Sequence, residues 1–252
     1  MNRTWTKNTQ FGGKTVYGAS IGILMLETKF PRIPGDIGNA TTWPFPVQFH
    51  VVKGATPHKV VREDPRVLID DFIAAAENLV ACGCDGITTN CGFLALMQDE
   101  LKDAVKVPVA TSSLMQVPMV QSLLPGNQRA GILTISKATL SADHLKACHV
   151  PPDTPIEGTD EGREFTQGIL SDAEELDFEA CRLDMLDAAT KLTTDHKDVG
   201  AIVLECTNMT PYAHDIRTAT GLPVFSIYSF LHWFQQALVP DQFPGALSDP
   251  RH

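Results

Sequence analysis

The sequence carries the same pattern of a buried strand and a cysteine twice. Residues 21–24 (IGIL) and 130–133 (AGIL) are short apolar runs around a glycine, and a second apolar run in each half ends in Cys91 or Cys206. The offset between the halves is 109 residues at the glycines and 115 residues at the cysteines. Pro108 and Pro223 are also 115 residues apart, so the second half carries about six extra residues before its cysteine. Three matching landmarks are not expected by chance. The repeat predicts two similar lobes, 16–117 and 128–232.

Within each lobe, predicted strands alternate with predicted helices. Short β-rich runs predict strands at 16–26, 86–89, 107–110, 130–135, 201–205 and 223–227. Periodic apolar residues predict helices at 64–82, 93–105 and 172–192, and a further helix that opens at Thr210-Pro211. Asp64 is the expected N-cap of the first helix, and Ser171 with Glu174 forms an expected capping box for the third. The pattern predicts an α/β fold with a parallel sheet flanked by helices in each pseudosymmetric lobe. The ends, 1–15 and 240–252, are predicted to be flexible arms.

Charge and composition exclude several classes of protein. Thirty acidic residues against twenty basic ones give a net charge of −10, which opposes binding to nucleic acids or to anionic membrane surfaces. The longest apolar run, 21–26, is far shorter than a transmembrane helix, and the first twenty residues lack an export signal, so we expect a cytoplasmic protein. The six cysteines are too few for a disulfide scaffold, and their spacing predicts no metal site. No nicotinamide or phosphate-loop motif is present, so we expect no cofactor.

The two repeated cysteines are the candidate catalytic groups. Cys91 and Cys206 each end a predicted strand just before a predicted helix, on the side of a parallel sheet where ligands bind. A helix N-terminus lowers the pKa of a nearby thiol, which predicts a reactive thiolate. If the lobes face each other, the two sulfurs reach opposite sides of one substrate carbon, as stereoinversion requires. The alternative is that both are ordinary buried cysteines at strand ends.

Segments 88–92 (TTNCG) and 204–208 (LECTN) resemble the cysteine motifs of the aspartate/glutamate racemase superfamily, the Asp/Glu/hydantoin racemase family. That superfamily also contains arylmalonate decarboxylase, maleate isomerase and algal-type dimethylsulfoniopropionate lyases. The resemblance covers both lobes and implies a cofactor-independent, two-lobed enzyme that forms a homodimer or a higher homo-oligomer. It implies a small carboxylate or amino-acid substrate, with Cys91 and Cys206 as its opposed acid and base.

The resemblance also implies which residues bind the substrate: Asn90, Gly92, Thr111, Ser112, Thr207, Asn208, Glu27 and Thr28. Three departures from glutamate racemases argue against that cell-wall activity. Glu27-Thr28 stands in place of Asp-Ser, Gly92-Phe93 in place of Asn-Thr after the first cysteine, and Asn208 in place of a histidine. The loop 27–39 resembles less characterised branches and, in its Pro-Gly-Asp pattern, the lyases. Arg32 on this loop could pair with a substrate carboxylate, but exposure on the loop is the favoured reading. Glu205 is expected to point away from the site if the strand continues through it.

These observations predict an isomerase, a racemase of amino acids or their derivatives. A related lyase, decarboxylase or isomerase acting on a small carboxylate, such as a dimethylsulfoniopropionate lyase-like enzyme, stays open as an alternative. So does a catalytically silent binding protein that keeps the cleft without using the thiols.

Overall fold

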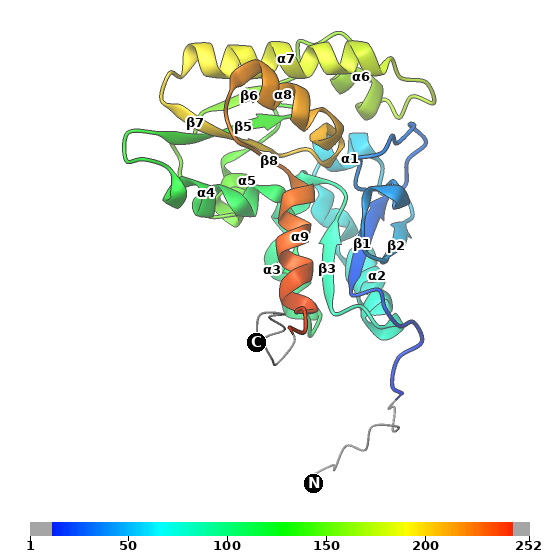
Figure 1. Cartoon of the computed structure of the whole chain (residues 1–252). Helices are drawn as coiled ribbons and strands as arrows, with labels where there is room; N and C mark the ends of the chain where they lie inside the picture. The colour runs from blue at the N-terminus through cyan, green and yellow to red at the C-terminus, as the bar shows by residue number, and fades with distance from the viewer. Residues whose placement is uncertain (1–11, 244–252) are drawn as a thin grey trace, which may run out of the picture.

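Two four-stranded parallel sheets form the frame of the protein in a computed structural model that describes residues 12–243 (Figure 1). The first sheet has the order β2-β1-β3-β4, with β1 Ile21–Leu26, β2 Val47–Val52, β3 Gly86–Thr89 and β4 Val109–Ala110. The second has the order β6-β5-β7-β8, with β5 Arg129–Thr134, β6 Ile156–Gly158, β7 Val199–Leu204 and β8 Val224–Phe225. The two orders are equivalent. The predicted α/β fold with two similar lobes is therefore confirmed.

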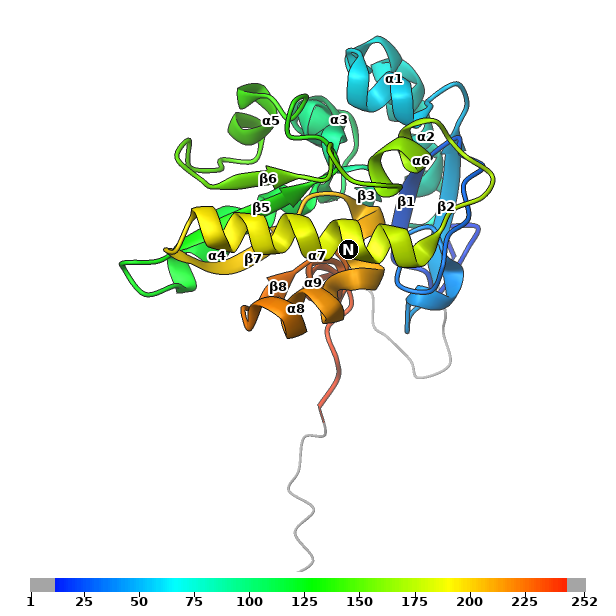
Figure 2. The same cartoon turned by 90° about the horizontal axis from the view of Figure 1, so that it is seen from above.

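Helices cover these sheets, and α7 lies across the second sheet in the view from above (Figure 2). The α-helices are α1 Pro57–Arg62, α2 Ile69–Cys82, α3 Gln98–Ala104, α4 Val117–Leu123, α5 Ala142–Ala147, α6 Phe165–Leu170, α7 Phe178–Asp195, α8 Ala213–Thr220 and α9 Ile227–Leu238. Short 3-10 helices are η1 Ala40–Thr42, η2 Pro65–Leu68, η3 Gly92–Met97, η4 Ser113–Gln116 and η5 Thr207–Tyr212. Over residues 12–243, none of the helices has the length and apolar character needed to cross a membrane.

The repeated glycines let a helix pack closely on the central strand of each sheet. β1 is buried along its whole length, as expected for a strand covered on both faces. A Cβ atom added to Gly22 would lie 2.9 Å from Cδ1 of Leu79 on α2. A Cβ atom added to Gly131 would lie 3.0 Å from Cδ2 of Leu192 on α7. The sequence repeat therefore reflects the same strand-helix contact in both lobes.

The last helix joins the second half of the chain to the first sheet. Helix α9 follows β8 in the sequence, yet it runs alongside β3 (Figure 1). Its residues Phe230, Leu231 and Phe234 are buried in one hydrophobic cluster with Ile21 and Ile23 of β1. This crossing places part of the core of the first lobe far along the chain. The predicted lobe bounds, 16–117 and 128–232, stay a prediction.

The predicted Asp64 cap is present, although it begins η2, which leads into α2, and the predicted start of the helix at 172–192 is wrong. Asp64 caps η2 by accepting a hydrogen bond from the Arg66 backbone N at 3.0 Å, and α2 continues to Cys82. The capping box predicted for Ser171 is wrong, because α7 begins at Phe178 with Asp177 as its N-cap. Asp172 instead has φ +56° and accepts a hydrogen bond from the Lys29 backbone N at 2.6 Å.

Two smaller predictions also differ. The strand predicted from residue 16 begins at Ile21, and Thr210-Pro211 lies inside η5 instead of opening the next helix. The parts 1–11 and 244–252 of the predicted arms lie outside the described residues.

Candidate active site

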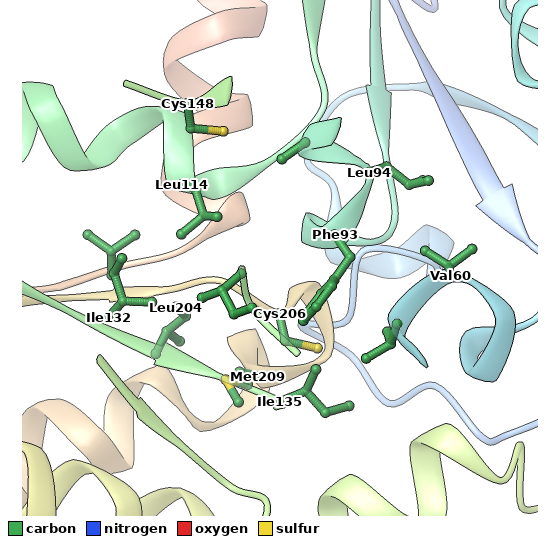
Figure 3. Packing of buried hydrophobic residues seen from close by; sticks show 14 of the residues in the cluster. Val60, Phe93, Leu94, Leu114, Ile132, Ile135, Cys148, Leu204, Cys206 and Met209 are labelled. Carbon is green, nitrogen blue, oxygen red and sulfur yellow. The ribbon is translucent and has the colours of Figure 1, made fainter. Parts of the chain in front are cut away.

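Cys91 and Cys206 line one pocket, to which both lobes contribute residues. Cys91 follows β3 and precedes η3, and Cys206 follows β7 and precedes η5. In Figure 3 the Phe93 ring, Ile135 and the Cys206 sulfur point toward one another. The full lining is Leu26, Thr28, Phe30, Arg32, Pro57, Val61, Asn90, Cys91, Phe93, Ile135, Ile169, Leu170, Glu205, Cys206 and Asn208. Most of these side chains are apolar.

A chain of polar contacts runs along one wall of the cavity to Cys206. Arg32 Nη1 donates to Asp36 Oδ1 at 2.8 Å, and Asn208 Nδ2 donates to Asp36 Oδ2 at 2.6 Å. The Asp36 carboxylate thereby fixes the orientation of the Asn208 amide. The Oδ1 atom of Asn208 accepts a hydrogen bond from the Cys206 thiol, with an Sγ–Oδ1 distance of 3.5 Å. Cys206 is therefore held as a proton-bearing thiol in this structure.

The residues that precede the two cysteines occupy equivalent positions, and each leaves one polar atom free. Asn90 Oδ1 accepts a hydrogen bond from the Leu26 backbone N at 2.8 Å, and Glu205 Oε2 accepts one from Thr134 Oγ1 at 2.8 Å. Asn90 Nδ2 and Glu205 Oε1 are buried without a hydrogen-bond partner among the described residues. Buried polar atoms are nearly always paired. The cavity thus offers one free donor and one free acceptor to a ligand.

Burial dominates the ionisation of both thiols. It raises the pKa of Cys91 to about 12, and the Glu205 charge adds to this, against the opposing effects of the Phe93 and Leu94 N–H groups and of Arg32. Burial also raises the pKa of Cys206 well above its ordinary value, with contributions from Glu205, Cys91 and Asp36. The thiolate expected from helix N-termini is therefore not supported, because loss of water outweighs the N–H donors.

Glu205 is the group in the cavity whose protonation changes near neutral pH. Burial raises the pKa of this carboxyl group to about 7, although the Thr134 hydroxyl and the Ile135 N–H both favour its ionised form.

Several solved structures have an architecture similar to that of this chain. The glutamate racemase of Bacillus anthracis superposes with a TM-score of 0.59, at 15% sequence identity over 88% of this chain and 85% of that one. An aspartate racemase of Picrophilus torridus gives a TM-score of 0.56 at 13% identity, over 90% and 96% of the two chains. The Gly74Cys mutant of arylmalonate decarboxylase gives 0.56 at 16% identity, over 91% and 96%. The chain shares the two-lobed α/β fold of these racemases and of arylmalonate decarboxylase.

Sequence comparison finds curated relatives that match most of this chain. Their names describe lyases, whereas the solved structures above are racemases and a decarboxylase. The dimethylsulfoniopropionate lyase of Durusdinium sp. clade D is 28% identical over 230 residues, which are 88% of this chain and 75% of that protein. Dimethylsulfoniopropionate lyase 7 of Emiliania huxleyi is 29% identical over 229 residues, 87% of this chain and 67% of that protein. Lyase 3 of the same organism is 30% identical over 215 residues, 82% and 56% of the two chains. No protein-family model matches the chain.

Several of the substrate-binding residues predicted from the superfamily lie at the cavity. Thr28, Asn90 and Asn208 line it. Thr207 and Gly92 lie just behind the lining. Thr207 Oγ1 donates to the Asn90 backbone O across the lobes at 2.5 Å, and Gly92 lies against Glu205.

The other three predicted substrate-binding residues do not line the cavity. Thr111 Oγ1 donates to Gln98 Oε1 at 2.7 Å, and Ser112 caps η4. Glu27 is exposed and accepts a hydrogen bond from the Gly54 backbone N at 2.8 Å. None of these three residues takes part in the proposed reaction.

Sequence reasoning missed two cavity residues. Arg32, expected to be exposed, has only 11% of its side chain exposed and lies 4.3 Å over the Phe30 ring. Its i,i+4 spacing to Asp36 was the available signal. Glu205, expected to point away, lines the cavity because β7 ends at Leu204, so strand alternation no longer applies at this residue. Among residues 12–243, no group of three or more His, Cys, Asp or Glu side chains is arranged to hold a metal ion.

Proposed function

We propose that this protein is a lyase that splits dimethylsulfoniopropionate after a cysteine removes the α-proton of the substrate. The observation that carries the proposal is that the Cys91 thiol lines a mainly apolar cavity together with a free buried donor, the Nδ2 atom of Asn90. The names of the sequence relatives support the lyase activity over racemisation. They reach 28–30% identity, whereas the racemases reach 13–15%.

The cavity suits both ends of this substrate. Dimethylsulfoniopropionate joins a carboxylate to a dimethylsulfonium group through two methylene carbons. The free Nδ2 donor of Asn90, which lines the cavity, is available to the carboxylate. The Phe93 ring lines the cavity and supplies an aromatic surface for the methylated cation, an attraction of about 0.5–2 kcal/mol.

The proposed reaction is a β-elimination. A cysteine thiolate takes the proton from the α-carbon, and the electron pair of that C–H bond forms the double bond between the α- and β-carbons. The bond from the β-carbon to sulfur breaks, and its electrons leave with the neutral dimethyl sulfide. The other product is acrylate. The surroundings favour Cys91 as the base, because Arg32 and two N–H groups stabilise its thiolate while Cys206 donates its proton to Asn208.

Amino-acid racemisation is the second candidate, because thiols from two lobes are what inversion at one carbon needs. One thiolate would remove the α-proton, and the opposite thiol would return a proton from behind. In this reaction both cysteines are indispensable. An elimination needs only one base.

The test incubates the purified protein in deuterated buffer with dimethylsulfoniopropionate and, separately, with each enantiomer of a panel of amino acids. Proton NMR follows acrylate formation and exchange at the α-carbon. The lyase proposal expects acrylate from wild type and a loss of about 100-fold or more in Cys91→Ser, because a hydroxyl group is too weak an acid to replace the thiolate. Cys206→Ser is expected to keep part of the elimination activity.

Cys82→Ser is the matched control, since Cys82 lies at the end of α2 and does not line the cavity. Its activity should equal that of wild type. Absence of acrylate, together with α-deuteration and inversion of an amino acid that both cysteine variants lose, would replace the lyase with the racemase. Turnover of neither substrate class would contradict both.

A further inference from the structure

Glu205 is a completely buried carboxyl group with one oxygen atom left unpaired. Its side chain has no exposed surface and lines the cavity with Cys91 and Cys206. Oε2 accepts the Thr134 hydroxyl hydrogen bond at 2.8 Å, and Oε1 has no partner among the described residues. A buried carboxyl oxygen without a hydrogen-bond partner lowers the stability of the folded protein. We therefore expect this oxygen to bind a ligand or to carry a proton.

The free oxygen is positioned between the two cysteine segments. Glu205 is the residue directly before Cys206 in the chain. Its Oε1 atom also lies against Gly92, the residue directly after Cys91, so closely that a Cβ atom on Gly92 would overlap it. The carboxyl group therefore reaches from the segment of one thiol to the segment of the other.

The charged and titratable groups around Glu205 leave room for only one negative charge. The thiols of Cys91 and Cys206 line the same cavity, and an ionised Glu205 raises the pKa of both, as it also does for Cys148. The positive charge of Arg32 is already matched by Asp36 at 2.8 Å. A thiolate beside an ionised Glu205 would place two uncompensated negative charges in one mainly apolar cavity, which is strongly unfavourable.

We propose that Glu205 and the two cysteines share protons as one unit with a single negative charge, which rests on Glu205 in the empty site and moves to a thiol when substrate binds. In this step the S–H bond breaks, its electron pair stays on sulfur, and the proton forms an O–H bond with Glu205. Because Oε1 accepts no hydrogen bond from either thiol in the empty site, the transfer takes place only in the substrate complex. Glu205 is thus a positioning residue that acts through the thiols, and the part of this inference that concerns turnover rests on the proposed function.

The electrostatics of the site agree with this order of ionisation. The pKa of Glu205 is raised to about 7, while that of Cys91 is raised to about 12, so the first proton lost from the empty site comes from the carboxyl group. A substrate with a cationic group supplies the positive charge that the cavity lacks. It therefore favours the transfer of the charge to sulfur.

The experiment measures thiol reactivity without substrate. Wild type and Glu205→Gln are treated with iodoacetamide between pH 5.5 and 9, and alkylation of the Cys91 and Cys206 peptides is followed by mass spectrometry. The glutamine keeps an acceptor for Thr134 and removes the charge. We expect Cys91 in the variant to react about tenfold faster or more at pH 8, with the difference vanishing at pH 5.5 where Glu205 is neutral in wild type. Alkylation of the half-buried Cys82 is the internal control.

A second variant, Thr134→Val, keeps the carboxyl group and removes its hydroxyl donor. Because that donor favours the ionised carboxylate, its loss should keep Glu205 neutral to a higher pH. Cys91 should then react faster than in wild type near pH 7 and at the wild-type rate at pH 9. Equal Cys91 rates in wild type and in both variants at every pH would overturn the shared-proton unit.

Turnover tests the transfer itself. If Glu205 receives the thiol proton, kcat of Glu205→Gln should fall at least tenfold even though its thiol reacts faster. A kcat that rises with the alkylation rate would show that Glu205 only suppresses the thiols, and it would overturn the transfer. If wild type turns over no substrate of either class, the proposed function fails, while the alkylation rates still decide whether the protons are shared.

Discussion

At the scale of single residues, Gly92 shows how closely the two lobes meet at the site. A Cβ atom at this position would lie 2.5 Å from the Glu205 backbone O and would overlap its carboxylate. A backbone oxygen in a strand end cannot move away as the tip of a long side chain can. The glycine is therefore required by the contact between the two cysteine segments.

Gly92→Ala is expected to lower the free energy of unfolding by about 1–3 kcal/mol, the usual cost of forcing an extra carbon into a packed site. Turnover should fall as well, because the displaced atoms belong to the segments of both cysteines. Gly126→Ala is the control, since a Cβ atom there meets no atom within 4 Å. Urea unfolding measures both effects on stability. Equal stability of the two variants would show that the lobes yield easily at this contact.

Glu205 also gives the stability of the protein a specific pH dependence. Its pKa is about 7 in the folded protein against an ordinary value of 4.5, so between these pH values the folded chain holds a proton that the unfolded chain has lost. Stability from this group is therefore present below pH 4.5 and is lost as pH rises toward and through 7. The shift corresponds to about 3 kcal/mol.

Wild type should accordingly lose about 3 kcal/mol of unfolding free energy relative to Glu205→Gln between pH 4.5 and pH 8. Urea unfolding of both proteins across this range measures the difference, and the contributions of the other titrating groups cancel in it. A constant difference at all pH values would mean that the buried carboxyl group ionises as it does in water.

At the scale of elements, the last helix completes the core of a lobe to which it does not belong in sequence. Helix α9 buries Leu231 completely against the first sheet, and the Trp43 ring stacks on Tyr228 of the same helix at 5.7 Å. The first half of the chain therefore lacks part of its own core. This arrangement makes the folding of the first lobe depend on residues beyond 226.

Leu231→Ala should cost about 2–5 kcal/mol of unfolding free energy, as expected for removing a fully buried leucine side chain. Gln236→Ala on the exposed face of the same helix should change it by less than about 0.5 kcal/mol. Urea midpoints of the two variants test this. A small effect at both positions would show that α9 is not part of the core of the first lobe.

At the scale of the whole molecule, the two lobes share a continuous apolar core and several direct contacts. One hydrophobic cluster includes Leu24 of the first sheet and Leu133 of the second. The Ser113 hydroxyl donates to the Leu204 backbone O, and Arg62 Nη1 donates to Ser136 Oγ at 3.2 Å. Neither lobe can unfold without exposing apolar surface of the other.

We therefore expect one cooperative unfolding transition. The tryptophans within residues 12–243, Trp43 and Trp233, lie in the first lobe and on α9, so their fluorescence reports that part of the molecule. Far-ultraviolet circular dichroism reports both sheets. The two signals should give the same urea midpoint. A circular-dichroism transition that separates from the fluorescence transition would show that the second lobe unfolds on its own.

The sequence alone determined the features that depend on residues close together in the chain. The apolar runs of the central strands, the Asp64 cap and the two cysteine segments are local signals, and the structure contains the corresponding elements. It missed β2, β6, α1, α4, α5, α6 and α9. β2 is a half-exposed edge strand, and β6, α1, α4, α5 and α6 are short elements. The false capping box has a similar cause, since a contact from Asp172 to a distant loop outweighs the local pattern.

Only the tertiary structure decided the chemistry of the site. The motif placed Cys91 and Cys206 in the chain, but their high pKa values arise from burial by residues of both lobes. Arg32 looked like an exposed loop residue, and its burial depends on Asp36 and on Asn208 from the other lobe. The sequence suggested a structural role for Glu205. In the structure β7 ends at Leu204, and Glu205 lines the cavity. Burial and charge pairing are properties of atoms brought together from distant parts of the chain, so no local pattern encodes them.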